Sequence, residues 1–312
     1  MIFRIRFAKY GVVKFIGHLD VMRYFQKAVR RSGLPIKYSQ GFNPHQLMVF
    51  AQPLGVGVTS DGEYMDIETE DVDFEGNALS AERVREILGG ALTEGFEIVS
   101  IRQIPWQEGT KHPENAMSLV AGADYVMSLK DGYTLHGKKA SDAEDSAEGS
   151  VADSLGINGY DVNGIIQSDI KELQNKLKEF LNRNSIVVSK KSKSGERDMD
   201  IKPYIYEASV VGNNDIPDFM FEDAINAGRL SDAASGNNSM LSDCKCLGIV
   251  HSDIYTPGVR FFFRLAAGSA VNIKPELVLE AFLEFCGIEY EELAFQIHRA
   301  NMYSDVITLK NL

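Results

Sequence analysis

The spacing of apolar residues switches between two periods along the chain, and the switches mark predicted strands and helices. Within residues 3–7, apolar side chains alternate with Arg4 and Arg6, which is typical of a strand with one buried face. Over residues 19–32, apolar side chains recur every three or four positions, which predicts an amphipathic helix. Gly33 can end that helix in the left-handed conformation.

The same criteria predict the other elements of the first hundred residues. Residues 47–50 form a short apolar strand, and residues 64–68 alternate as a second strand. Ser80 can cap a helix over residues 81–88, and a strand follows at 96–101. The order strand, helix, strand, strand, helix, strand is that of a ferredoxin-like βαββαβ sandwich.

A second set of elements follows in the same order, although no residue-level repeat accompanies it. Helices are predicted where apolar residues recur at helical spacing or where a proline can open the helix. The predicted strands are 125–129, 205–211, 260–265 and 295–302, and the predicted helices are 166–181 and 275–286.

These patterns predict an α+β protein with two tandem ferredoxin-like βαββαβ units. The N-terminal domain spans residues 1–104 and carries the basic surface, and the C-terminal domain spans residues 123–312. Residues 105–122 contain proline and glycine without periodicity, so we expect a linker there. Two acidic stretches of low hydrophobicity, at about 131–165 and 213–245, are expected to be polar inserts in the second unit.

Charge is unevenly distributed along the chain. The first fifty residues contain nine Lys or Arg and one acid, Asp20, whereas the whole chain contains 32 Lys or Arg and 44 Asp or Glu. A basic segment in an acidic protein points to an anionic partner such as a nucleic acid. A solvated basic face would have the same composition, so charge alone leaves both readings open.

Composition also limits which cellular compartment and which kinds of cofactor or metal site we expect. No apolar run approaches the ~18 residues of a membrane helix, and the first residues lack a signal-peptide core, so we expect a cytoplasmic protein without a membrane partner. Cys244, Cys246 and Cys286 are too few and wrongly spaced for a disulfide framework, a zinc site or an iron–sulfur ligand set. We expect plain thiols and no cofactor.

A dense group of turn-forming and aromatic residues lies between the first helix and the strand at 64–68. It comprises residues 37–45 and, downstream, residues 53–57. Loops of this kind carry function more often than the elements they join, although glycine and proline equally serve turn geometry. The Gly55-Val56-Gly57 sequence lacks the Lys-Ser/Thr ending of a phosphate-binding loop, so no nucleotide site is expected there.

Five segments carry a resemblance to a known family. They are Arg4-Ile5-Arg6-Phe7, Phe15-Ile16-Gly17-His18-Leu19-Asp20, Arg30-Arg31-Ser32-Gly33-Leu34-Pro35, Tyr38-Ser39-Gln40-Gly41-Phe42-Asn43-Pro44-His45 and Ala51-Gln52-Pro53-Leu54. Together they resemble the radical-SAM-linked domain of unknown function, which occurs as a separate protein or fused after a radical-SAM enzyme domain. The match is dense over residues 1–70 and weaker to about Tyr303. Gln46 stands where the family often has a second proline.

The resemblance implies association with a radical-SAM enzyme. Such an enzyme needs three cysteine thiolates close together to hold its [4Fe–4S] cluster, and this chain lacks them, so that chemistry would belong to a separate partner. The resemblance carries over no catalytic residues.

Our leading hypothesis is a noncatalytic RNA-binding accessory protein that presents substrate to this separate radical-SAM enzyme. A ferredoxin-like sheet with basic and aromatic residues is a common RNA-binding surface. The candidate RNA-binding residues are Arg4, Arg6, Lys9, Tyr10, Lys14, His18, Arg23, Lys27, Arg30, Arg31, Lys37, Tyr38, Phe42, Asn43 and His45. The helix stripe with Arg23 and Lys27 should point away from the open sheet face, so the charges can form two patches.

An enzyme is the first alternative, namely a metal-independent ribonuclease of the CRISPR RNA-processing type. His18 or His45 could transfer protons, while Lys14, Lys27 or Tyr38 stabilises the negative charge that develops on the phosphate. A metal site built from His18, Asp20 and His45 is disfavoured, because side chains two positions apart on a helix diverge.

The second alternative is a protein-only scaffold for the radical-SAM partner. It would use the region of Phe15, Phe42 and Phe50 as an apolar contact. We expect these aromatic side chains in the core instead, because large apolar residues are mostly buried.

Overall fold

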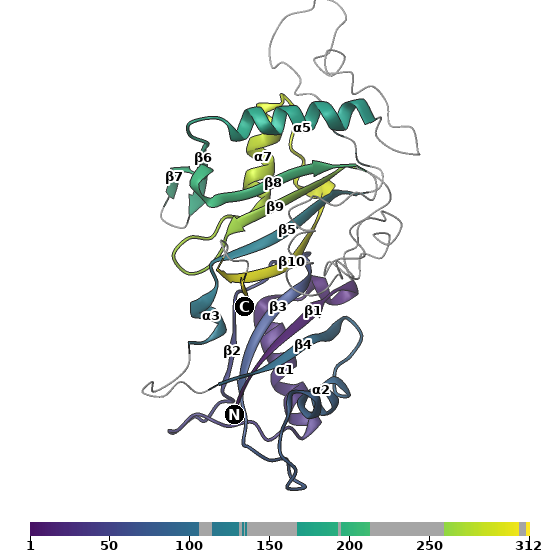
Figure 1. The fold of residues 1–312 in the computed structure, drawn as a ribbon, viewed down its shortest axis with the longest axis vertical. Helices are drawn as coiled ribbons and strands as arrows, with labels where there is room; N and C mark the ends of the chain where they lie inside the picture. The colour runs from purple at the N-terminus through teal and green to yellow at the C-terminus, as the bar shows by residue number, and fades with distance from the viewer. Residues whose placement is uncertain are drawn as a thin grey trace, which may run out of the picture.

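A computed structural model describes residues 1–105, 114–130, 133, 135, 167–192, 195–212, 259–305 and 310–312 (Figure 1). The N-terminal half contains β1 (Ile2–Lys9), the 3-10 helix η1 (Gly11–Phe15), α1 (His18–Ser32), β2 (Met48–Phe50), β3 (Thr59–Glu68), α2 (Ala81–Gly89) and β4 (Phe96–Ile104). The C-terminal half contains α3 (Ala116–Leu119), β5 (Gly122–Leu129), α5 (Gln167–Leu181), β6 (Val187–Ser192), β7 (Gly195–Asp200), η2 (Lys202–Tyr204), β8 (Ile205–Val211), β9 (Arg260–Ala266), α7 (Pro275–Phe285), η6 (Glu292–Ala294), β10 (Phe295–Asp305) and β11 (Lys310–Asn311).

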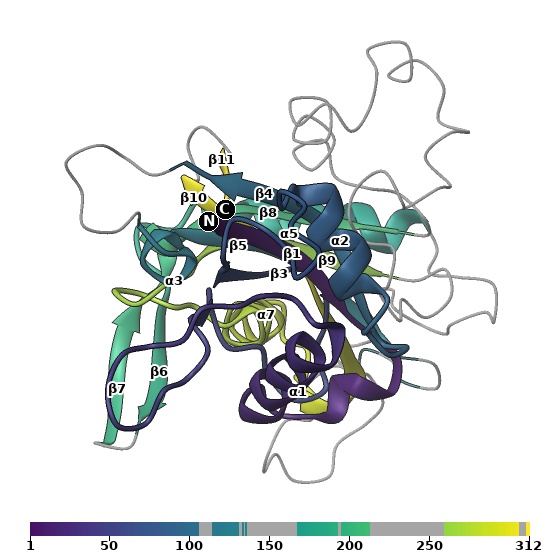
Figure 2. The same ribbon diagram turned by 90° about the horizontal axis from the view of Figure 1, so that it is seen from below.

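The fold is α+β with a large, mostly antiparallel sheet, and each strand and helix predicted from the sequence is present. The prediction missed α3, which lies in the segment expected to be a linker, and the β6–β7 hairpin, which projects from the C-terminal half (Figure 2). β6 and β7 pair only with each other and are rich in polar residues, so they lack the apolar alternation of a buried strand. The inserts predicted at 131–165 and 213–245 lie outside the described residues, apart from Tyr133 and Leu135.

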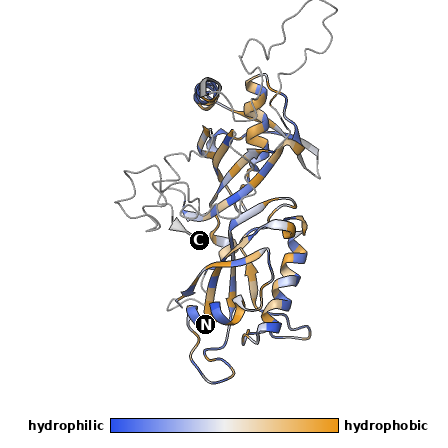
Figure 3. Ribbon diagram, turned by 90° about the vertical axis from the view of Figure 1, so that its right-hand side faces the viewer, coloured by the Kyte–Doolittle hydropathy of each residue, from blue (hydrophilic) through white to orange (hydrophobic). Residues whose placement is uncertain are grey.

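The N-terminal core lies between one face of the sheet and two helices. The alternating residues of β1 supply Phe3, Ile5 and Phe7, and α1 and α2 supply side chains such as Phe25 and Leu88. Hydrophobic and hydrophilic residues both occur along the strands of the two halves (Figure 3). Gly33 follows α1 with a φ of 72°, which is the predicted left-handed helix end.

The C-terminal core repeats this arrangement. α5 and α7 cover the same face of the sheet, with Phe180 and Phe282 in edge-to-face contact at 5.6 Å between ring centroids. Ala51 and Tyr64 of the N-terminal half belong to this second cluster, so the apolar core continues from one half into the other.

Among the described residues, nine strands form one sheet, in which the order β4-β1-β3-β10-β5-β9-β8 runs through both halves. The halves meet where β3 pairs with β10 in parallel, with Thr59 opposite His298 and Ser60 opposite Arg299. The other neighbouring pairs of the described sheet are antiparallel. β2 pairs with the far end of β3, so β10 and β2 lie one after the other along the same edge of β3.

Buried polar side chains fix the β3–β10 seam. Arg299 donates to both carboxylate oxygens of Glu63, from Nε at 2.8 Å and from Nη2 at 2.7 Å, and both side chains are buried. Tyr64 donates its hydroxyl to Asn301 Oδ1 at 2.8 Å, and Ser60 Oγ donates to the carbonyl of Arg299 at 2.8 Å. Each of these bonds crosses from β3 to β10, so side chains continue the pairing where backbone pairing is short.

Gly62 allows the two strands to approach each other closely. A Cβ atom at this position would lie 2.4 Å from Asn301 Cα and 2.7 Å from the carbonyl oxygen of Ala300. Both atoms belong to the backbone of β10 and cannot move aside as a side chain would. Glycine is therefore required here by space.

Gly62→Ala is expected to lower the free energy of unfolding by about 2–4 kcal/mol, because the added methyl group separates β3 from β10. Urea unfolding followed by circular dichroism measures this loss. Gly89→Ala is the matched control, since its Cβ would meet only Ile98 Cδ1 at 4.0 Å. The control should change stability by less than about 1 kcal/mol, and equal effects of the two substitutions would contradict the close approach.

Arg299→Met is expected to cost about 3–5 kcal/mol of unfolding free energy, because it leaves the buried Glu63 carboxylate without its partner. The double variant Glu63→Leu with Arg299→Met should be more stable than Arg299→Met alone, because no buried charge remains. Arg23→Ala removes the exposed Arg23–Asp20 pair and should cost at most about 1 kcal/mol. A loss for Arg299→Met no larger than this control would show that the seam does not depend on the ion pair.

Candidate functional site

The earliest predicted RNA-binding cations, Arg4, Arg6 and Lys9, are buried and paired within the protein. Arg4 donates to both carboxylate oxygens of Asp66 at 2.7 and 2.8 Å. Arg6 donates to the carbonyls of Asp61 and Ala300. The alternation of β1 places both arginines opposite the aromatic core as expected, but burial leaves neither guanidinium open to a phosphate in this structure.

The segment before α3 covers part of the sheet face that we expected to be open. Arg4 also donates to the carbonyl of Glu114 at 3.2 Å, and the backbone N–H of Ala116 donates to Asp66 Oδ2 at 2.7 Å. Asp66 thus accepts hydrogen bonds from Arg4 of β1 and from the backbone of Ala116 at the same time. The sheet face over β1 and β3 is therefore an internal contact with the segment that the sequence indicated as a linker.

Lys9 and His18 lie near the Glu63–Arg299 pair. Lys9 Nζ donates to the carbonyls of Lys14 and Ile16 at 3.1 Å each, and burial lowers the pKa of Lys9. The His18 ring lies edge-on to Phe50 with centroids 5.7 Å apart. Burial lowers the pKa of His18, and the positive charges of Arg299 and Lys9 add to this effect against the raising effect of Glu63. The hydrogen bonds of Lys9 and the ring contact of His18 thus lie within the N-terminal half, and the charges of Glu63 and Arg299 act on both groups.

A small cavity of about 120 Å³ adjoins the junction of the two halves. Pro53 and Leu54 of the loop after β2 line it together with Tyr125, Arg299 and the start of α7. The Ala51-Gln52-Pro53-Leu54 segment is thus part of the contact between the halves, a role that local sequence does not indicate.

The exposed cations of the basic segment lie on α1. Arg23, Lys27, Arg30 and Arg31 are exposed, as the predicted second stripe of the helix requires. Arg23 pairs with Asp20 at 3.1 Å, and Arg31 donates to the carbonyl of Ala91. Lys27 and Arg30 make no ion pair or hydrogen bond with another residue that the structure describes.

The loop of residues 38–46 lies against α1. Gln46 Nε2 donates to the carbonyl of Gln26 at 3.3 Å, and Gln26 is the neighbour of Lys27 on the helix. Tyr38 is 45% exposed, and Phe42 projects fully into solvent. Exposed His45 shares a 2.8 Å hydrogen bond between its Nδ1 and Ser39 Oγ. The loop therefore presents aromatic rings beside a helix with unpaired cations.

The remaining predicted RNA-binding residues are less accessible or less close to this surface. Asn43 is exposed within the loop. Lys37 is half-buried and pairs with Glu68 at 3.5 Å. Tyr10 and Lys14 are also half-buried, and Lys14 Nζ lies 3.4 Å from Gln296 Oε1 and 5.3 Å from the centroid of the Phe15 ring.

The expectation that Phe15, Phe42 and Phe50 are core residues is correct for Phe50 and wrong for the other two. Phe50 packs against Phe7 and Phe25, whereas Phe15 is 65% exposed. Phe15 falls in η1 and Phe42 at a loop tip, where the apolar periodicity of a helix or strand gives no information about burial. Both rings are available for contact.

The residues weighed for proton transfer or metal binding have different surroundings. His18 is half-buried at the start of α1, and His45 is exposed in the loop. Within the described ranges, no group of three or more His, Cys, Asp or Glu side chains is placed to hold a metal ion. Burial raises the pKa of Cys286 to about 12, while Cys244 and Cys246 lie outside the described residues.

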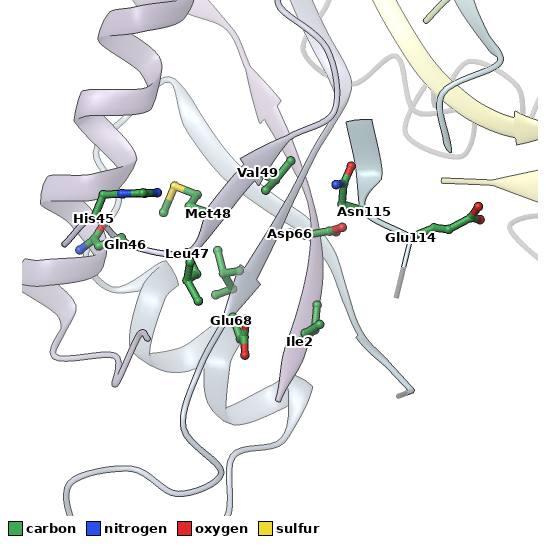
Figure 4. Close-up of a pocket in the computed structure, with 11 residues that line it drawn as sticks. Ile2, His45, Gln46, Leu47, Met48, Val49, Asp66, Glu68, Glu114 and Asn115 are labelled. Carbon is green, nitrogen blue, oxygen red and sulfur yellow. The ribbon is translucent and has the colours of Figure 1, made fainter. Parts of the chain in front are cut away.

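The structure also contains a larger cavity of about 160 Å³ beside β2 (Figure 4). Its lining includes His45 and Gln46 from the end of the loop. Because Gln46 also bonds to Gln26 of α1, the loop contacts both the cavity and the helix. No sequence pattern indicated it, because the lining comes from β1, β2, β3 and the segment at 114–115.

Comparison with known proteins identifies a family for the chain. Residues 3–232, well over half of the chain, match the family described as "Uncharacterized protein conserved in bacteria (DUF2344)", and the chain belongs to that family. A comparison with curated proteins returns no match. In the described part of the chain, no helix is long and apolar enough to cross a membrane.

Acidification is expected to destabilise the protein partly through His18. Its pKa is lower in the folded protein than the ordinary 6.5, so the unfolded chain binds more protons as the pH falls through 6.5. Stability is therefore lost as the pH drops from 6.5 toward the folded pKa, by at most ~1.4 kcal/mol per pH unit and by less where water reaches the ring.

Urea unfolding at a series of pH values measures this dependence. His18→Gln should flatten it, because the substituted side chain does not titrate. His45→Gln, at an exposed histidine, is the matched control. An unchanged pH dependence in His18→Gln would show that His18 is not held in its neutral form.

Proposed function

We propose that the protein is a noncatalytic RNA-binding accessory protein that presents RNA to a separate radical-SAM enzyme. The observation that carries the RNA part is the surface formed by α1 and the loop of residues 38–46. There, Lys27 and Arg30 are exposed without a described partner, and the loop with Tyr38 and Phe42 is bonded to the same helix.

The side chains on this surface suit single-stranded RNA. Lysine and arginine neutralise phosphates and release counterions, while exposed aromatic rings stack on unpaired bases. Tyr38 and Phe42 supply such rings, and Arg23, Lys27 and Arg30 supply the charge along α1. Because stacking accepts every base, this combination favours binding without strong sequence preference.

The proposed surface differs from the sheet face considered first. Arg4, Arg6 and Lys9 are held by internal partners, so we assign them to the fold and not to RNA. α1 packs its apolar side against the opposite face of the sheet and turns its charged side to solvent. The proposed RNA contact therefore lies on the helical layer.

The enzyme partner is proposed from the resemblance of residues 1–70 to the radical-SAM-linked domain. We also infer that each half is a ferredoxin-like unit, because the orders β4-β1-β3-β2 and β10-β5-β9-β8 have the same arrangement relative to the chain. A cytoplasmic location accords with an RNA partner.

Lys27→Glu with Arg30→Glu is expected to weaken binding of a fluorescent polyuridine oligonucleotide about tenfold or more at low salt. The slope of log affinity against log salt should also become shallower by about one to two units, since two phosphate contacts are lost. Fluorescence anisotropy over a salt series measures both quantities.

The matched control is Lys171→Glu with Lys178→Glu, which places the same charge change on exposed positions of α5. It should weaken binding much less than the α1 variant and leave the salt slope close to that of the unmodified protein. Equal losses of affinity for the two variants, or an affinity that does not change with salt concentration, would contradict the proposed RNA surface.

A protein-only scaffold is the second candidate, favoured by exposed apolar residues around η1. Val12, Phe15 and Leu19 follow one another at spacings of three and four residues, and each is at least 65% exposed. Exposed Val56 belongs to the neighbouring loop, in which Gly57 donates its backbone N–H to the carbonyl of Lys14. The salt series separates the two functions, because a protein-only scaffold has no affinity for the oligonucleotide.

A further inference from the structure

The 160 Å³ cavity lies beside β2 and extends over β3 to Ile2 of β1 and to residues 114–115 (Figure 4). Five consecutive residues, 45–49, line it, and Met48 and Val49 among them belong to β2. Glu114 and Asn115 lie on the other side, across β3 from the β2 residues.

The backbone of β2 has unpaired groups at the edge that faces away from β3. Glu68 donates its N–H to the Leu47 carbonyl at 3.0 Å, and Ala51 donates its N–H to the Tyr64 carbonyl at 2.9 Å. In an antiparallel strand, the N–H and C=O groups of every second residue point to the same side. Because Leu47 and Ala51 bond to β3, the N–H and C=O groups of Met48 and Phe50 point away from β3. Within the described residues, no hydrogen bond to these groups is present.

The cavity is apolar with an acidic rim. Ile2, Leu47 and Val49 supply apolar surface. Exposed Glu114 supplies a carboxylate, and Glu68, which pairs with Lys37 at 3.5 Å, supplies a second. Gln46 is 5% exposed, and its Oε1 has no hydrogen-bond donor. A ligand that fits has an aliphatic side chain for the cavity, backbone groups for β2, and positive charge for the rim.

We propose that β2 is a docking site for a partner protein, which adds an extended segment to the sheet as a further strand. The segment carries a large aliphatic residue flanked by Lys or Arg. Met48 and Phe50 offer two N–H donors and two carbonyl acceptors, which is the arrangement of β-strand addition. Exposed Glu114, whose carboxylate has no ion pair among the described residues, favours a basic segment over an RNA backbone.

This docking site does not rest on RNA binding at α1. The acidic groups of the rim, Glu68 and Glu114, are different residues from the cations of α1, and a basic peptide and an RNA have opposite charge requirements. Both ligands could therefore bind one molecule at the same time, with the protein partner along the sheet edge and the RNA on the helix.

The probe is the acetylated and amidated peptide Lys-Leu-Lys-Val-Lys-Leu, titrated into the full-length protein labelled with nitrogen-15. We expect saturable shifts of the Met48 and Phe50 amide signals, with a dissociation constant at or below ~1 mM. The same peptide methylated on every backbone nitrogen, and the peptide with Glu in place of Lys, should each bind at least about tenfold more weakly.

Glu114→Lys should weaken binding several-fold, because it reverses a charge on the rim without removing a described side-chain bond. Glu94→Lys, at an exposed position outside the cavity lining, is the control and should bind as the unmodified protein does. The proposal is overturned if the three peptides bind equally, if no saturable shift is reached at ~1 mM, or if polyuridine shifts the same two amides.

Discussion

The buried ion pair of Glu63 and Arg299 is the contact on which the arrangement of this protein depends. It lies where two halves, each with its own helices, share one sheet through a short parallel pairing of β3 and β10. A bidentate pair is satisfied in only one relative position of the strands, so we infer that it fixes the register of the halves. Gly62 allows the close approach that this register needs.

The same burial divides the basic segment into two groups with different roles. One group, Arg4, Arg6 and Lys9, is buried and makes contacts inside the protein. The other group consists of the exposed cations on α1. The loop of residues 38–46 then connects two surfaces of opposite character. One side faces the cations of α1, and the other leads through His45 and Gln46 to an apolar cavity with acidic groups. The accessory role that we propose, in which one protein holds an RNA and an enzyme, needs two such distinct surfaces.

Local sequence patterns predicted most of the secondary structure, because apolar periodicity directly reflects burial on one face of an element. They placed Arg4 and Arg6 on the correct side of β1 but could not show that both are buried, since Asp66 and Ala300 lie far away in the sequence. The seam was not predictable for the same reason, as it joins residues 59–64 to residues 298–301. The charged stripe of α1 was predicted from its spacing and is exposed, whereas the cavity beside β2 needs four separate segments to form.

Native-state hydrogen exchange at increasing urea tests most directly whether the seam joins the halves into one cooperative unit. The slowest amides of β1 in the N-terminal half and of β5 in the C-terminal half are then compared for their free energies of opening. If the seam governs the fold, the two values agree and fall with the same urea dependence toward global unfolding. If one half opens at a free energy lower by more than ~2 kcal/mol while the other stays protected, the halves are independent and the account is contradicted.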